Sequence, residues 1–284
     1  MPVRDDVDLT TRQRNLLNQW LGPFELIADH SWPLQDTTVL QIRTVSSGTG
    51  EDFIVKASST SHHIAREIQA HLSGAVSLPG RIPTMRFSSV EDGMLVADFV
   101  PGTLVEGTPA EFDAETYRQA GQLLAVLQHP CGESSEYFPA LKAKTLDILA
   151  RSVDLLGAHD LAQLNLEIKG LRPGTVSLTF THGDYQPRNW LLDDEHINII
   201  DFGRADTRHW TSDLVRLHHQ QFLGRPDLEA AFYAGYGRGV DAAETDIWRL
   251  ENLNQAVGTV LWAHQIADAD FEQQGRGMVE RLLA

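Results

Sequence analysis

The stretch THGDYQPRNWLL at residues 181–192, followed by INIIDFG at 197–203, decides how this chain is interpreted. Asp184 and Asn189 lie five positions apart with a proline between them, and Asp201 comes twelve residues after Asn189. The apolar, β-prone segments on either side of the polar run at 193–196 predict a hairpin. Such a hairpin would return Asp201 to the side of Asn189.

Asn189 and Asp201 would then direct one amide oxygen and one carboxylate at a common point. Oxygen atoms of this kind suit Mg²⁺, which proteins usually hold with one or two carboxylates together with substrate phosphates. Asp184 would remain available to accept the proton of an attacking hydroxyl. The opposing interpretation is a polar loop beside a hairpin, without chemistry.

A catalytic aspartate, a later asparagine and an Asp-Phe-Gly occur in this order in kinases. Here the leading triplet is His-Gly-Asp at 182–184, and with it the stretch resembles the aminoglycoside phosphotransferase and choline kinase-like family. The resemblance implies an α+β, two-lobed protein kinase-like fold. A small antiparallel-sheet N-lobe at 1–100 would bind nucleotide, and a mainly helical C-lobe at 101–284 would carry catalysis and acceptor binding.

The resemblance also implies an activity and roles for particular residues. ATP or GTP would donate a phosphoryl group to a hydroxyl with the help of Mg²⁺, with Asp184 taking the hydroxyl proton and Asn189 and Asp201 holding the metal. His182 and Asp213 would support the catalytic loop, Asp213 through the loop's backbone amides. Asp213 also suits a helix N-cap.

Five segments have the pattern of strands, at 24–27, 37–45, 53–55, 85–87 and 93–99, and helical spacing occurs at 12–22 and 61–73. Lys56 ends the third strand and Glu67 lies in the second helix. In the family these places hold the lysine that contacts the nucleotide phosphates and the glutamate that orients it. A solvated strand-end lysine and an ordinary exposed helix glutamate are the alternatives.

The loop at 30–36 between the first two strands, where kinase-like folds cover the phosphates, contains no glycine. Gly48 and Gly50 lie in the next turn, at 46–51, so the expected phosphate contacts are the Ser31 hydroxyl and nearby backbone amides. No Gly-x-x-x-x-Gly-Lys-Ser/Thr occurs, so this is not a P-loop enzyme. The backbone of Asp98 and Val100, by position in the hinge, is expected to pair with the nucleotide base.

Beyond residue 101 the pattern is mostly helical apart from the hairpin. A Thr-Pro-Ala-Glu start at 108–111 predicts a helix to about residue 128, with further helices at 146–156, 160–171 and from 230 onward. Tyr185 and Arg188 are expected beside the acceptor. Four carboxylates of the tail could meet a cationic substrate, although solvated surface is the simpler interpretation: Glu251, Asp268, Asp270 and Glu272.

Composition sets wider bounds. The chain has 284 residues, 42% of them hydrophobic and 22% charged, with one cysteine, Cys131. It has no run of 18 apolar residues, and four charged groups occupy the first ten positions, so we expect neither a membrane span nor a secretory signal and place the protein in the cytoplasm. The net charge of −16 disfavours binding to nucleic acid. It either keeps the protein soluble or attracts a polycationic substrate.

The leading functional hypothesis is therefore a small-molecule kinase acting on a cationic acceptor such as an aminoglycoside or a related antibiotic. A choline-like amine, homoserine or a sugar are alternative acceptors. A pseudoenzyme that only binds nucleotide is the competing class, and the presence of Lys56, Asp184, Asn189 and Asp201 argues against it. Oligomeric state leaves no signature in the sequence.

Overall fold

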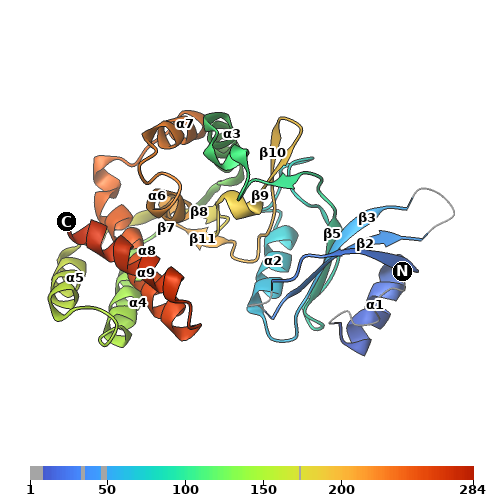
Figure 1. Ribbon diagram of the computed structural model, residues 1–284, viewed down its shortest axis with the longest axis horizontal. Helices are drawn as coiled ribbons and strands as arrows, with labels where there is room; N and C mark the ends of the chain where they lie inside the picture. The colour runs from blue at the N-terminus through green and yellow to red at the C-terminus, as the bar shows by residue number, and fades with distance from the viewer. Residues whose placement is uncertain (1–8, 33–35, 46–49, 173) are drawn as a thin grey trace. The chain divides into compact units, whose positions relative to one another are not determined.

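The computed structural model describes residues 9–32, 36–45, 50–172 and 174–284 (Figure 1). The chain forms two compact units, Met1–Phe112 with Pro187–Asp206, and Asp113–Gln186 with Thr207–Ala284. This division differs from the predicted boundary at 100, because the predicted hairpin pairs with a strand at 103–104 and joins the first unit. Most of the turn predicted at 46–51 lies outside the described residues.

The first unit is built on an antiparallel sheet in the order β1-β2-β3-β5-β4. All five predicted strands are present: β1 (Phe24–Asp29), β2 (Thr38–Thr44), β3 (Asp52–Ala57), β4 (Met85–Ser89) and β5 (Met94–Asp98). Side chains alternate between the two faces of a strand. Along β5, Met94 and Val96 accordingly pack with α1 (Thr11–Leu21), whereas Leu95 and Ala97 pack with α2 (His62–Leu72).

The predicted hairpin is formed by β9 (Trp190–Asp193) and β10 (His196–Ile199), with Asp193 opposite His196. Asp194, in the turn, has a positive φ of 51°. The short β6 (Thr103–Leu104) adds a third strand against β9, and a 3₁₀ turn, η2 (Pro187–Asn189), leads into the hairpin. Trp190, Ile197 and Ile199 are buried, which fixes the hairpin in its register.

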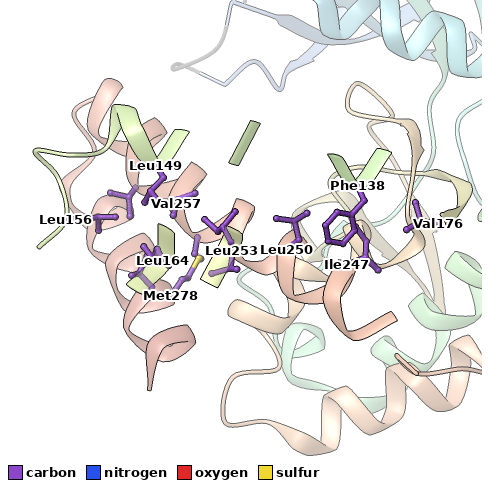
Figure 2. Close-up of a cluster of buried hydrophobic side chains, with 14 residues drawn as sticks. Phe138, Leu149, Leu156, Leu164, Val176, Ile247, Leu250, Leu253, Val257 and Met278 are labelled. Atoms are coloured by element: carbon purple, nitrogen blue, oxygen red, sulfur yellow. The ribbon is translucent and has the colours of Figure 1, made fainter. Parts of the chain in front are cut away.

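The second unit is mainly helical, as predicted. Its helices are α3 (Ala114–Leu127), α4 (Tyr137–Arg151), α5 (Ala158–Gly170), α6 (Val215–His219), α7 (Pro226–Tyr236), α8 (Thr245–Gln265) and α9 (Ala269–Leu283). The core follows α8, whose Leu250, Leu253 and Val257 pack among side chains of α4, α5 and α9 (Figure 2). Among the described residues, no helix is both long enough and apolar enough to cross a membrane.

Two local expectations for the chain beyond residue 101 were wrong. The segment after Thr108 forms only a 3₁₀ turn, η1 (Pro109–Phe112), and α3 begins at Ala114 because the Asp113 carboxylate caps it through the Glu115 amide at 3.0 Å. A second three-stranded sheet was also not expected. It contains β7 (Pro130–Ser134), β8 (Val176–Thr181) and β11 (Asp206–Arg208), and β8 leads directly into His182.

Candidate active site

Lys56 and Glu67 lie together in the first unit. On β3, Lys56 alternates with the buried Val55 and Ala57, so its side chain lies on the sheet face that carries α2. Its Nζ donates to Glu67 Oε1 at 3.0 Å and Oε2 at 2.8 Å, and to Asp201 Oδ1 at 2.9 Å. Glu67 is 4% exposed, so it is not the ordinary surface residue of the alternative interpretation.

Burial acts on both partners of this ion pair. It would lower the pKa of the Lys56 ammonium, but the carboxylates of Asp201 and Glu67 outweigh burial and raise that pKa above its ordinary value. Burial raises the pKa of the Glu67 carboxyl, and the nearby Asp201 adds to the effect. Lys56 therefore stays charged at neutral pH and available to an anionic ligand.

The Asp-Phe-Gly segment is fastened to α2. Phe202 is fully buried and its amide donates to Glu67 Oε1 at 3.4 Å, while His63 Nδ1 lies 2.9 Å from the Gly203 carbonyl oxygen. Asp201 has a φ of 66°, a left-handed conformation that is uncommon outside glycine. This conformation leaves its side chain 48% exposed while Phe202 packs inward.

The hairpin returns Asp201 to Asn189 as the spacing predicts. The Ile200 amide donates to the Asn189 carbonyl oxygen at 3.0 Å, so the residue next to Asp201 is bonded to Asn189. Asn189 is buried at the end of η2. An amide side chain and a half-exposed carboxylate thus stand on adjoining backbone, and both offer oxygen ligands of the kind that Mg²⁺ takes.

The loop that carries Asp184 is braced within the second unit by Asp213. The Asp213 carboxylate accepts from the His182 amide at 3.0 Å, the Gly183 amide at 2.6 Å and Gln128 Nε2 at 2.9 Å. His182 Nδ1 in turn accepts from the Asp184 amide at 3.2 Å. These are the backbone contacts expected of His182 and Asp213.

Two partners of Asp184 were missed by the sequence analysis. Gln186 Nε2 donates to Asp184 Oδ1 at 2.5 Å, and Arg216 of α6 lies 3.1 Å from the same oxygen. Asp184 is 4% exposed. Gln186 could have been suspected from its position two residues along the loop, but Arg216 lies 32 residues away and carries no local motif.

Tyr185 was expected beside the acceptor, and that expectation was wrong. The ring is buried against His182 and Phe232, and its hydroxyl donates to the Ala120 carbonyl at 2.7 Å. Tyr185 therefore ties the loop to α3. Arg188, in the first unit, places its guanidinium 5.5 Å from the centre of the Trp32 ring, a cation–π contact.

The remaining nucleotide candidates are only partly available. The Ser31 amide donates to Asp29 Oδ1 at 2.9 Å and its hydroxyl accepts from the Val39 amide at 2.9 Å. Hydrogen bonds from the Ser31 hydroxyl and the Ser31 amide lower the pKa of Asp29. The Asp98 amide is taken by the Thr84 carbonyl at 2.9 Å, whereas the Val100 amide bonds to no described residue.

Three of the four acidic residues singled out in the tail have structural partners. Glu251 is buried, not solvated as we had expected, and accepts from the Tyr137 hydroxyl at 2.5 Å. Asp268 caps α9 and Glu272 pairs with Arg276 and His264. Asp270 is exposed in the first turn of α9.

Comparison with known proteins identifies the fold and the family. The spectinomycin phosphotransferase APH(9)-Ia, solved with ADP and spectinomycin, is 15% identical with a TM-score of 0.62, and the match covers 98% of each chain. The macrolide 2'-phosphotransferase MphH from Brachybacterium faecium is also 15% identical, with a TM-score of 0.60 over 93% of this chain and 95% of that one. A thermostable mutant of the aminoglycoside phosphotransferase APH(4)-Ia, solved with AMP-PNP and hygromycin B, is 12% identical with a TM-score of 0.65 over 96% and 98%.

At these identities the likeness shows the fold, which is the two-lobed protein kinase-like fold predicted from the sequence. The chain belongs to the phosphotransferase enzyme family, whose model matches residues 41–250. A comparison with curated protein sequences finds no match.

Proposed function

We propose that this protein transfers the γ-phosphoryl group of ATP or GTP to a hydroxyl of a small acceptor molecule. The observation that carries the proposal is the Lys56–Glu67–Asp201 ion-pair cluster, because it gathers the phosphate-binding and metal-binding residues of a kinase in one unit. Family membership and the Asp213-braced loop around Asp184 support it.

In this proposal Lys56 neutralises phosphate charge, and Glu67 orients the Lys56 side chain. The two Glu67 oxygens already hold the Lys56 ammonium, so little side-chain freedom remains to be lost when a nucleotide binds. The Val100 amide and the Asp98 carbonyl would pair with the base, since the Asp98 amide is taken. Ser31 would contact phosphate only after giving up a bond to Asp29 or Val39.

The donor atoms present fit Mg²⁺. Within the described ranges no three His, Cys, Asp or Glu side chains gather as a metal site of their own. Asn189 and Asp201 would therefore hold the ion with help from phosphate oxygens, which is the usual way that proteins bind Mg²⁺. Bound there, the ion would supply neutralisation of phosphate charge.

Asp184 would accept the proton of the acceptor hydroxyl or orient that hydroxyl for attack. Gln186 and Arg216 both engage its Oδ1 and so hold the carboxylate in one orientation. His182 and Asp213 hold the backbone beneath it. Catalysis would come mainly from positioning and electrostatics, as in other phosphoryl transfers.

The acceptor that we propose is an aminoglycoside or a related cationic antibiotic. The net charge of −16 favours a cation. Known structures of this fold include enzymes solved with hygromycin B and with spectinomycin. A choline-like amine, homoserine and a sugar are the competing acceptors, since the fold alone does not determine the substrate.

A screen of acceptors with ADP or GDP release as the readout tests this function. We expect Mg²⁺-dependent release that rises with one class of acceptor and disappears in Asp184→Ala. Asp201→Ala should weaken Mg²⁺-dependent nucleotide binding, measured separately by calorimetry. Unchanged turnover in Asp184→Ala, or unchanged nucleotide binding in Asp201→Ala, would reject the assigned role. Resistance conferred on a sensitive host would directly test the proposal that the acceptor is an antibiotic.

A further inference from the structure

A cavity of about 260 Å³ lies in the second unit among α6, the start of α7, α8 and the end of α9. We call it the α6–α9 cavity. Its titratable wall residues are His218, His219, Glu229, Arg249 and Arg281, and apolar side chains complete the wall. None of the proposed active-site residues lines it. The volume is well above what one water molecule needs, so a polyatomic group can enter.

The charge of this wall is opposite to that of the whole protein. Two arginines face one glutamate, although the chain has 39 acidic and 23 basic residues. Arg249, like Arg238 and Arg276 of the same unit, contacts a carboxylate. Arg281 is exposed and makes no ion pair or hydrogen bond with any described residue, so its guanidinium is available to an anionic ligand.

Arg249 is held in place at the cavity. Its Nε pairs with Glu167 and one of its terminal nitrogens donates to the Leu282 carbonyl. These contacts orient the guanidinium and leave further N–H groups on it, since an arginine carries five. A fixed guanidinium loses little entropy when it binds an oxyanion.

The histidines add polar but uncharged donors. His219 is 5% exposed, and its Nε2 makes no hydrogen bond of normal length in the described part of the chain, although Asn252 lies nearby. Burial lowers the pKa of His219 to about 3, and the positive charges of its neighbours, Arg281 and Arg249 among them, add to this. Burial also lowers the pKa of His218. The cavity thus already disfavours a cation.

We propose that the α6–α9 cavity binds a small oxyanion, a phosphate group in preference to a carboxylate. The planar guanidinium of Arg281 can donate two parallel hydrogen bonds to either group. Glu229 is the acidic member of the wall and repels a second carboxylate. Hydrogen phosphate carries a proton that it can donate to Glu229, which explains the preference.

Calorimetric titration of the full-length protein, without nucleotide and at constant ionic strength, tests the proposal. The probes are inorganic phosphate, methyl phosphate and malonate. We expect saturable binding of one phosphate per chain, with malonate weaker. Arg281→Gln should raise the Kd about tenfold or more, the usual effect of losing a charge-assisted hydrogen bond. Leu223→Trp, which adds bulk at an exposed lining residue, should also weaken binding.

Arg276→Gln is the matched control, because it removes the same charge from the same helix outside the cavity wall. It should leave phosphate binding unchanged. Absence of saturable phosphate binding in the wild type would overturn the proposal, as would equal weakening by Arg276→Gln and Arg281→Gln. Tighter binding of malonate than of phosphate would overturn the stated preference. Thermal melts of each variant confirm that the proteins compared are folded.

Discussion

Removing the Asp213 carboxylate should destabilise the second unit and abolish turnover together. Asp213 is 2% exposed and accepts from the backbone amides of His182 and Gly183. In Asp213→Ala both amides lose their acceptor, while Gln128 keeps its bond to the Trp210 carbonyl at 3.1 Å. The buried His182 donor costs about 1–3 kcal/mol when it is unsatisfied and the partly buried Gly183 donor costs less, so the expected loss is about 1–5 kcal/mol.

That loss is a large share of a typical stability of about 5–15 kcal/mol. Urea unfolding followed by circular dichroism would measure it. Asp246→Ala is the matched control, because this carboxylate accepts one backbone amide, that of Arg172 at 3.1 Å, at an exposed position. We expect it to lose no more than about 1 kcal/mol. A loss below about 1 kcal/mol for Asp213→Ala, or full turnover in that variant, would refute the bracing role.

Three further perturbations follow from single contacts. Burial raises the pKa of Glu251 to about 7, so folding favours its protonated form. Between pH 5 and 8 the unfolding free energy of Glu251→Gln should therefore rise relative to that of wild type by up to about 3 kcal/mol. A pH-independent difference between the two proteins in urea titrations would contradict this. Arg216→Gln should lower kcat at least about tenfold, and Arg216→Lys should retain part of the activity. Equal rates for wild type and both variants would exclude a role of Arg216 in positioning Asp184. A Cβ at Gly235 would lie 1.9 Å from the Arg118 carbonyl oxygen of α3, so Gly235→Ala should destabilise the folded protein by about 1–3 kcal/mol. An unchanged melting temperature would show that α3 and α7 can move apart without loss of stability.

Features with a short-range signal were predicted well. The hairpin at 190–199 has two β-prone segments around a polar turn, and β9 and β10 follow them closely. The five strands of the first sheet and the helices α1 and α2 were predicted from local side-chain patterns and turn composition. Lys56 and Glu67 were chosen because they occupy the places that the family resemblance gives to a lysine and a glutamate, and they form an ion pair.

Features that depend on long-range packing were missed. Arg216 reaches Asp184 only because α6 folds back onto the loop that carries Asp184, and nothing near Arg216 in the sequence indicates this. Tyr185 lies in a loop, and its sequence position does not indicate that the Ala120 carbonyl of α3 provides a buried acceptor for its hydroxyl. Glu251 was placed on the surface because a glutamate on a helix usually lies there, but α8 is buried along much of its length. The strand β8 was missed although Pro173-Gly174 marks a turn before it, because its partners β7 and β11 come from other parts of the chain.

Transfer of radiolabel from γ-³²P-labelled ATP or GTP to the acceptor found in the screen is the most direct test of the central claim. With Mg²⁺ present, the wild-type protein should label the acceptor, and both Asp184→Ala and Asp201→Ala should fail to do so while remaining folded. Labelled acceptor in the Asp184→Ala reaction at the wild-type rate would contradict phosphoryl transfer through this site.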